Sequence, residues 1–203
     1  TRTIEVFDAE TRTLTNSIQF DGQIIDITFC PESKRIAVGL DKSELQVVDV
    51  LARRRDVHIP IPSSGLRQIA WTPDGRQLIS CGGETTIREW DADTGAAVGS
   101  LTGHPTDVTS IAVTPDGKRL ISGDRDGHVF FWDIDGKSAT HRLRCGTHPI
   151  RSVAVSGDGL QFGATNTDSL FIIWDDEGQA QVIRQLTRAA HHFQFMPDDG
   201  STL

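Results

Sequence analysis

Hydrophobic and polar residues alternate along this chain in short runs, and Gly, Asp and Pro residues separate the runs. The pattern is clearest in the stretch Gly103–Asp133, where Ile111 and Val113 alternate with smaller residues, as in a half-buried strand. The run Val129-Phe130-Phe131-Trp132 is apolar throughout, as expected of a strand that is covered on both faces. Asp-Gly segments supply the turns, because Gly tolerates the positive φ that tight hairpins need. This part of the chain predicts four strands, at Val108–Thr114, Arg119–Ser122, His128–Trp132 and Thr140–Arg144.

The pattern repeats along the whole chain with a period of about 42 residues. One marker is an aspartate that follows an apolar residue at the end of a predicted strand, and the second marker is a turn. The aspartates are Asp8, Asp49, Asp91, Asp133 and Asp175, which are separated by steps of 41, 42, 42 and 42 residues. The turns begin at Pro31, Pro73, Pro115, Gly157 and Pro197, with steps of 42, 42, 42 and 40 residues. Because two unrelated markers keep one period, we interpret the chain as a series of repeats.

The stretch Gly103–Asp133 carries the features of a known repeat. It opens with Gly103-His104, turns at Pro115-Asp116-Gly117 and closes on Trp132-Asp133. In these features it resembles the WD-repeat β-propeller family, whose four-stranded blades are about 40–45 residues long. The resemblance covers essentially the whole chain, although only this copy is complete. It implies an all-β fold, a β-propeller of four-stranded antiparallel blades.

The copies predict a single propeller domain over residues 1–203, with four full blades and two partial ones. The full blades are expected at residues 23–61, 65–101, 107–144 and 149–186, and the partial ones at residues 1–20 and 190–203. In the partial copies, Thr1–Asp8 and Leu14–Phe20 correspond to third and fourth strands, and Ala190–Met196 corresponds to a first strand. The absence of an initiator Met and the ending inside a strand favour a fragment of a longer ring, commonly seven-bladed in the family. A five-bladed ring that the two partial blades close is the alternative.

Composition narrows the class of protein and of partner. The chain is 37% hydrophobic and 24% charged, which fits a globular protein. Its formal net charge of −8 argues against a nucleic-acid partner held through phosphates, since that mode needs a basic face. No apolar run approaches the roughly 18 residues that span a bilayer, so we expect no membrane interaction. The odd and widely spaced cysteines, Cys30, Cys81 and Cys145, favour reduced thiols and a cytoplasmic location.

His104, Ser122 and Asp126 have the composition of a hydrolase triad. A triad needs an exposed nucleophile, an oxyanion hole and a substrate cleft, whereas Ser122 is predicted to lie inside a strand. The family resemblance implies instead that His104, Ser122, Asp126 and Trp132 form a buried, hydrogen-bonded tetrad that ties a loop to its blade. Only one copy keeps all four members. We therefore expect a structural tetrad and no catalytic residues.

Three weaker signals have simple interpretations. His141, Cys145 and His148 have a spacing that suggests zinc, but only three ligands are visible, and we expect no metal and no cofactor. The run Arg53-Arg54-Arg55 lies where other copies have a polar turn, and such a run is usually only solvated. No Gly-rich phosphate-binding loop opens a helix, so no small-molecule substrate is evident.

A further set of residues recurs just after the start of each predicted inner strand. The family resemblance implies that this position, and the position before the tetrad Asp, face the narrow rim of the ring, where partner peptides bind. Arginine offers paired donors to carboxylates and phosphates, so we expect a rim that binds acidic or phosphorylated segments. The rim residues are Arg67, Thr109, Arg125, Arg151 and His191. Pairing of these arginines with nearby acids such as Asp107 or Asp124 is the alternative.

These features favour a non-catalytic protein–protein interaction scaffold, because strand pairing fixes the blades while the loops vary freely. The resemblance also implies a second interpretation, in which the propeller is a regulatory or substrate-recruiting domain. Its parent would then be a larger, bacterial-type signalling kinase, ATPase or protease. A propeller hydrolase is least favoured, since no set of His, Asp or Glu residues recurs in several copies.

Overall fold

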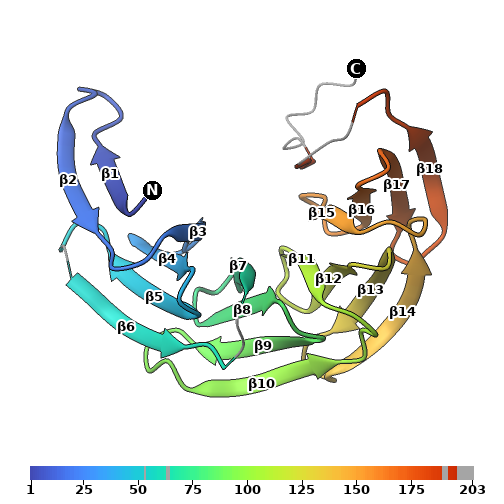
Figure 1. The fold of residues 1–203 in the computed structure, drawn as a ribbon, viewed down its shortest axis with the longest axis horizontal. Helices are drawn as coiled ribbons and strands as arrows, with labels where there is room; N and C mark the ends of the chain where they lie inside the picture. The colour runs from blue at the N-terminus through green and yellow to red at the C-terminus, as the bar shows by residue number, and fades with distance from the viewer. Residues whose placement is uncertain (53, 63–64, 189–191, 196–203) are drawn as a thin grey trace.

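The computed structural model of the chain describes residues 1–52, 54–62, 65–188 and 192–195. These residues form eighteen strands and no helix, so no helix able to cross a membrane is present among them. The strands build four four-stranded antiparallel sheets and one two-stranded sheet, each from strands that are consecutive in the chain. Figure 1 shows the sheets as blades around a common axis, in an open arc with the two-stranded sheet at one end. The predicted all-β propeller architecture is confirmed.

The blades are numbered in chain order, and in each of them the chain runs from an inner strand to an outer one (Figure 1). The two-stranded sheet contains β1 (Thr3–Phe7) and β2 (Leu14–Gln19). Blade 1 contains β3 (Ile24–Phe29), β4 (Arg35–Leu40), β5 (Glu44–Asp49) and β6 (Arg54–Pro60). Blade 2 contains β7 (Leu66–Trp71), β8 (Gln77–Gly82), β9 (Thr86–Asp91) and β10 (Ala97–Thr102). Blade 3 contains β11 (Val108–Val113), β12 (Arg119–Asp124), β13 (His128–Asp133) and β14 (Ser138–Arg144), and blade 4 contains β15 (Ile150–Val155), β16 (Gln161–Asn166), β17 (Leu170–Asp175) and β18 (Ala180–Gln185).

The strands of blade 3 lie where the sequence pattern places them, with ends that differ by at most two residues. The first strand expected over Ala190–Met196 differs, because residues 192–195, the described part of that range, contain no strand. Side chains of blade 4 hold this segment instead. The backbone N–H of Phe193 lies 3.4 Å from Ser152 Oγ, and the Phe193 ring meets the ring of Phe171 edge-on at 5.2 Å. The turn expected at Pro197 lies outside the described residues.

The repeated aspartates hold the turns. Asp91 Oδ1 accepts the backbone N–H groups of Asp93 and Thr94 at 3.1 and 2.8 Å, which closes the turn between β9 and β10. In the turn after β11, Asp116 Oδ1 accepts the Thr114 hydroxyl at 2.6 Å and the Lys118 N–H at 3.0 Å. The side-chain hydrogen bonds from these threonines lower the pKa of both aspartates. The 42-residue period of the sequence therefore reflects the regular spacing of the aspartates whose side chains close the turns.

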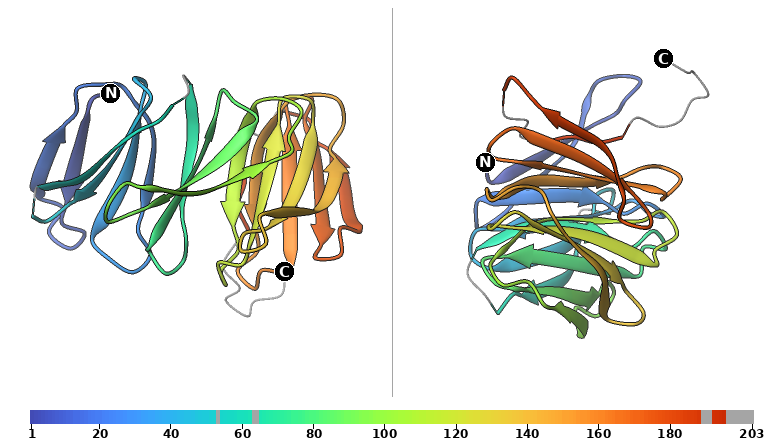
Figure 2. Two further views of the ribbon diagram at one scale, coloured as in Figure 1. Left: turned by 90° about the horizontal axis from the view of Figure 1, so that it is seen from below. Right: turned by 90° about the vertical axis from the view of Figure 1, so that its right-hand side faces the viewer.

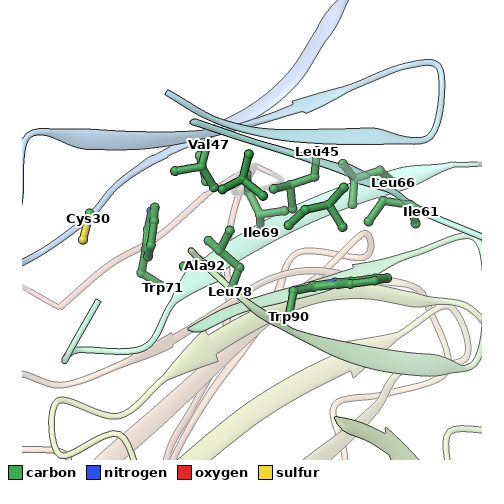
Figure 3. Packing of buried hydrophobic residues seen from close by; sticks show 13 residues of the cluster. Cys30, Leu45, Val47, Ile61, Leu66, Ile69, Trp71, Leu78, Trp90 and Ala92 are labelled. Atoms are coloured by element: carbon green, nitrogen blue, oxygen red, sulfur yellow. The ribbon is translucent and has the colours of Figure 1, made fainter. Parts of the chain in front are cut away.

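The hydrophobic cores lie between neighbouring blades, because the sheets pack face to face. Between blades 1 and 2, Leu45 and Val47 of β5 pack with Ile69 and Trp71 of β7, and none of the four is more than 5% exposed (Figure 3). Similar clusters lie between blades 2 and 3, between blades 3 and 4, and between the two-stranded sheet and blade 1. Burial of one such side chain contributes about 1.5–3 kcal/mol. In the left view of Figure 2 the sheets accordingly follow one another across the molecule, from the blue N-terminal sheet to the orange blade 4.

A second link between blades runs along the inner strands, and the sequence did not predict it. Each inner strand has a register shift that involves its second residue. The residue after the shift accepts a backbone N–H from the inner strand of the next blade. The three bonds are Ile69 N to Asp26 Oδ2 at 2.8 Å, Ile111 N to Gln68 Oε1 at 2.9 Å, and Val153 N to Ser110 Oγ at 3.1 Å.

Asp26 is the charged member of this series, and Asp26→Asn is expected to stabilise the protein at neutral pH. Burial raises the pKa of Asp26, outweighing the N–H groups of Ile69 and Ile27 and the attraction of His192. A raised folded-state pKa destabilises the fold above that pKa, and the penalty disappears below the ordinary value of about 4. Asn keeps an oxygen that can accept the Ile69 N–H. The second oxygen of Asp26, which accepts the Ile27 N–H, is lost, but Ile27 is exposed and water can replace that acceptor. Urea unfolding should therefore give the variant the higher free energy of unfolding at pH 7 and no advantage near pH 3. A less stable variant at pH 7 would contradict this account.

Candidate functional site

A chain of hydrogen bonds runs from the third strand of blade 3 to the loop before its first strand. Trp132 Nε1 donates to Ser122 Oγ at 2.7 Å, and Ser122 Oγ lies 2.6 Å from His104 Nε2. His104 Nδ1 lies 3.0 Å from Asp124 Oδ2. An indole N–H can only donate, so the Ser122 hydroxyl gives its own proton to His104 Nε2, which leaves the imidazole proton on Nδ1 facing Asp124. Every donor in the chain then has an acceptor.

The carboxylate in this chain is Asp124, and the expectation of Asp126 in that place is wrong. β12 continues beyond its predicted end at Ser122 to Asp124. Residues two apart in a strand share a face, so Asp124 points inward with Ser122 and its side chain is fully buried. Asp126 lies in the following turn and is exposed. The backbone N–H groups of Asp126 and His128 both donate to Asp124 Oδ1 at 2.9 Å, so Asp124 also caps that turn.

Aromatic rings and a second histidine surround the tetrad. The His104 ring stacks on Phe130 with 4.2 Å between the centroids, and the Arg142 guanidinium lies 5.4 Å from the centroid of the Phe130 ring. His128 approaches Asp124 from the surface, with its Nδ1 3.1 Å from Asp124 Oδ2. Burial alone would raise the pKa of Asp124, but the hydrogen bonds from His104 and from the His128 backbone outweigh it and lower that pKa.

The arrangement connects strands and has no accessible nucleophile. Ser122 has no exposed surface, and its oxygen already accepts the Trp132 N–H. Nucleophilic catalysis needs a hydroxyl that a substrate can reach. The geometry supports a structural interpretation, in which the tetrad joins β12, β13 and the loop of His104.

The residues with zinc-like spacing do not come together as a metal site. Cys145 is fully buried, with Sγ 3.9 Å from the carbonyl oxygens of Ala164 and Leu170, and burial raises its pKa to about 12. A metal-binding thiolate is therefore disfavoured there. The His141 ring packs against Phe131, whereas His148 is exposed. Within the part of the chain that the structure describes, no group of three or more His, Cys, Asp and Glu side chains is placed to hold a metal.

The expected rim residues have different surroundings. Arg67 is exposed, and Thr109 is half-buried with its hydroxyl donating to the Gly123 carbonyl at 3.0 Å. Arg125 pairs with Asp107 at 3.4 Å, as the alternative interpretation anticipated. Arg151 is half-buried. His191 lies outside the described residues, as does Arg53 of the arginine run.

A buried ion pair between blades 2 and 3 escaped the sequence analysis. Glu89 of β9 has a side chain that is 1% exposed, and Lys137, in the turn after β13, donates to its Oε2. The structure gives Glu89 Oε1 no partner among the described residues. Gly99 makes room for the carboxylate, since a Cβ there would lie 2.7 Å from Glu89 Oε2. The sequence signal was a Glu at a position that other copies fill with apolar residues, namely Val47, Phe131 and Ile173.

Comparison with known proteins agrees with this architecture. A family model described as "WD domain, G-beta repeat" matches residues 55–91 and 95–133, the second of which ends on the Trp132-Asp133 of blade 3. The two matched segments of the chain are thus repeats of the WD type. Repeats of this type imply a protein–protein interaction scaffold, and WD domains are generally non-catalytic.

Two curated relatives align with parts of this WD-repeat chain. It is 25% identical over 95 residues to U3 small nucleolar RNA-associated protein 21 of Saccharomyces cerevisiae, covering 47% of the chain and 10% of that protein. It is 53% identical over 30 residues to WD repeat-containing protein 26 homolog of Arabidopsis thaliana, covering 15% of the chain and 5% of that protein. The aligned regions are thus about a tenth or less of the length of either relative.

The other WD repeats of this chain hold their blades with fewer polar contacts. In blade 2, Trp90 Nε1 still donates to Ser80 Oγ at 2.9 Å. In blade 4, Asn166 replaces Asp124: its amide donates to the Cys145 carbonyl at 2.7 Å, and its oxygen accepts two backbone N–H groups of the next turn. In blade 1 the same region is apolar and contains the buried residues Phe20, Val38, Leu40 and Val48. Packing thus replaces the tetrad where its polar members are missing.

Proposed function

We propose that this WD-repeat domain is a scaffold that binds partner proteins or peptides through its rim, and that acidic or phosphorylated segments are its preferred ligands. The observation that carries the proposal is the position of Arg67, Thr109 and Arg151. Each stands at the register shift near the start of the inner strand of its blade. Such bulges re-aim side chains, so neighbouring blades present these residues at the same level of the propeller.

The charges at this level suit an anionic ligand. Arg67 is exposed, and the described residues provide it with no ion pair. The side chain of Arg125 is 55% exposed, and its 3.4 Å contact with Asp107 is a surface pair, which contributes about 0–1 kcal/mol. A phosphate or carboxylate can displace Asp107, because arginine binds such groups through paired hydrogen bonds. The chain as a whole has a net charge of −8 and repels anions. These arginines give the rim a local positive charge that attracts them.

Charge reversal at the two exposed arginines tests the proposal. We expect the Arg67→Glu/Arg125→Glu variant to bind arrayed phosphoserine, phosphothreonine and Glu-rich peptides at least about tenfold more weakly than the parent chain. The matched control is Arg12→Glu/Arg76→Glu, which changes the net charge equally at exposed positions in turns. The proposal fails if both variants lose binding equally, or if the parent chain prefers uncharged or basic peptides.

A further inference from the structure

A polar pocket lies on the outer part of blade 1, apart from the tetrad. It has a volume of about 410 Å³. Its walls come from β5, β6 and the loop between β2 and β3, and the residues that line it are Asp21, Glu44, Gln46, Asp56, Val57 and His58. Three of these six carry carboxylates, so the pocket concentrates the negative charge of an already acidic chain.

Glu44 has hydrogen-bonding capacity left over. Its Oε1 lies 2.7 Å from His58 Nε2 and accepts the side-chain amide of Gln46 at 2.5 Å. No described residue donates to its Oε2. A carboxylate accepts at both oxygens, and the Glu44 side chain is only 20% exposed, so a donor in the pocket would complete its hydrogen bonding.

Gln46 supplies the observation that points to a ligand. The residue is 4% exposed, and the described residues leave its Oε1 without a hydrogen-bond partner. The amide orientation follows from chemistry, because exchanging oxygen and nitrogen would set the amide oxygen against the Glu44 carboxylate. A buried acceptor without a donor costs free energy, which a donating ligand would recover. Other copies place Arg88, Phe130 and Ile172 at this position, so an amide here belongs to blade 1 alone.

We propose that this pocket binds the guanidinium group of an arginine side chain from a partner protein. Two of the residues that line the pocket have an acceptor without a donor among the described residues, Glu44 at Oε2 and Gln46 at Oε1. A guanidinium presents five N–H donors in a planar fork, whereas an ammonium is a compact group with three. Val57 supplies apolar surface for the methylene stem. The volume suits a side chain, and no metal-binding group occurs among the described residues.

A second acidic pocket shows why charge alone does not carry the proposal. It has a volume of about 310 Å³ and includes Asp74, Asp116 and Asp135 among its lining residues. Lys118 also lines it, and Asp74 and Asp116 already accept threonine hydroxyls and backbone N–H groups. No atom of its lining is a buried acceptor without a partner. It therefore serves as an internal control.

Titration of the ¹⁵N-labelled full chain with N-acetyl-arginine amide tests the assignment. We expect saturable chemical-shift changes at the side-chain amide of Gln46 and the backbone of Val57 and His58, with a millimolar dissociation constant. Glu44→Gln should weaken this binding about tenfold, because the guanidinium loses a charged acceptor. Asp135→Asn, which makes the same change in net charge at the control pocket, should leave the affinity unchanged. Near-ultraviolet circular dichroism verifies that both variants are folded.

Three outcomes would overturn the proposal. An absence of saturable shifts at Gln46 and His58 would show that the pocket does not bind the group. Equal weakening by Glu44→Gln and Asp135→Asn would reduce the effect to general electrostatic attraction. Equal affinity for N-acetyl-lysine amide would show that the pocket does not select guanidinium.

Discussion

Asp124→Ala is expected to lower the free energy of unfolding by about 3–5 kcal/mol. The buried carboxylate accepts the backbone N–H groups of Asp126 and His128 and the ring N–H of His104, and it lies beside the His128 ring. Alanine removes all of these acceptors at once, and a buried donor left unpaired costs about 1–3 kcal/mol. Urea unfolding followed by tryptophan fluorescence measures the loss, since Trp132 lies in the same network.

Two further substitutions separate the role of Asp124 from that of the turn itself. Asp126→Ala should change stability by no more than about 0.5 kcal/mol, because its side chain is exposed. Asp124→Asn should give an intermediate loss, since Asn166 caps the corresponding turn of blade 4 through its amide oxygen. Equal destabilisation by Asp124→Ala and Asp126→Ala would refute the assignment of Asp124 to the tetrad.

Lys137→Met is expected to destabilise the protein by about 3 kcal/mol, although Lys137 lies in a turn and its side chain is 41% exposed. The cause lies in its partner. Glu89 is buried between blades 2 and 3, and its carboxylate loses its counter-charge when the lysine is replaced. Thermal and urea unfolding of the variant and the parent chain at pH 7 measure the difference.

The double variant Glu89→Leu/Lys137→Met is the matched control. It should recover most of the lost stability, because well-packed apolar residues often replace a buried ion pair without a net loss. Position 89 accepts an apolar residue in the other blades, where Val47, Phe131 and Ile173 occupy it. A double variant as unstable as Lys137→Met would show that the loss does not come from the buried charge.

The sequence predicted the local structure of the chain well, because strand and turn signals are local. Alternation of apolar residues located the strands of blade 3, and the Asp-containing turns fixed the period. The assignment of Asp126 to the tetrad, which rested on the family resemblance, was wrong for a local reason as well. The predicted second strand ended at Ser122, which placed both aspartates in the turn. In the structure the strand continues to Asp124, and this two-residue difference decides which carboxylate is buried.

Contacts between blades could not be predicted in the same way. Asp26 and Ile69 are 43 residues apart, and Glu89 and Lys137 are 48 apart, so each partner depends on how neighbouring blades dock. A register shift in the inner strand also redirects the side chains after it, and no turn signal marks that shift. The unusual Glu89 could have been noticed against its apolar counterparts, but its lysine partner could not have been identified.

The position of the hydrophobic cores has a consequence for how the protein unfolds. Because each core is shared by two neighbouring sheets, opening blade 1, 2 or 3 removes a wall from the clusters on both of its sides. Stability is then distributed as in a one-dimensional array, in which each unit depends on its immediate neighbours. Amide protons of the inner and middle strands of blades 2 and 3 should exchange with solvent only in openings that also expose an adjoining blade. A substitution that weakens the core between two blades therefore destabilises both of them. The cooperative unit of this fold is the pair of neighbouring blades.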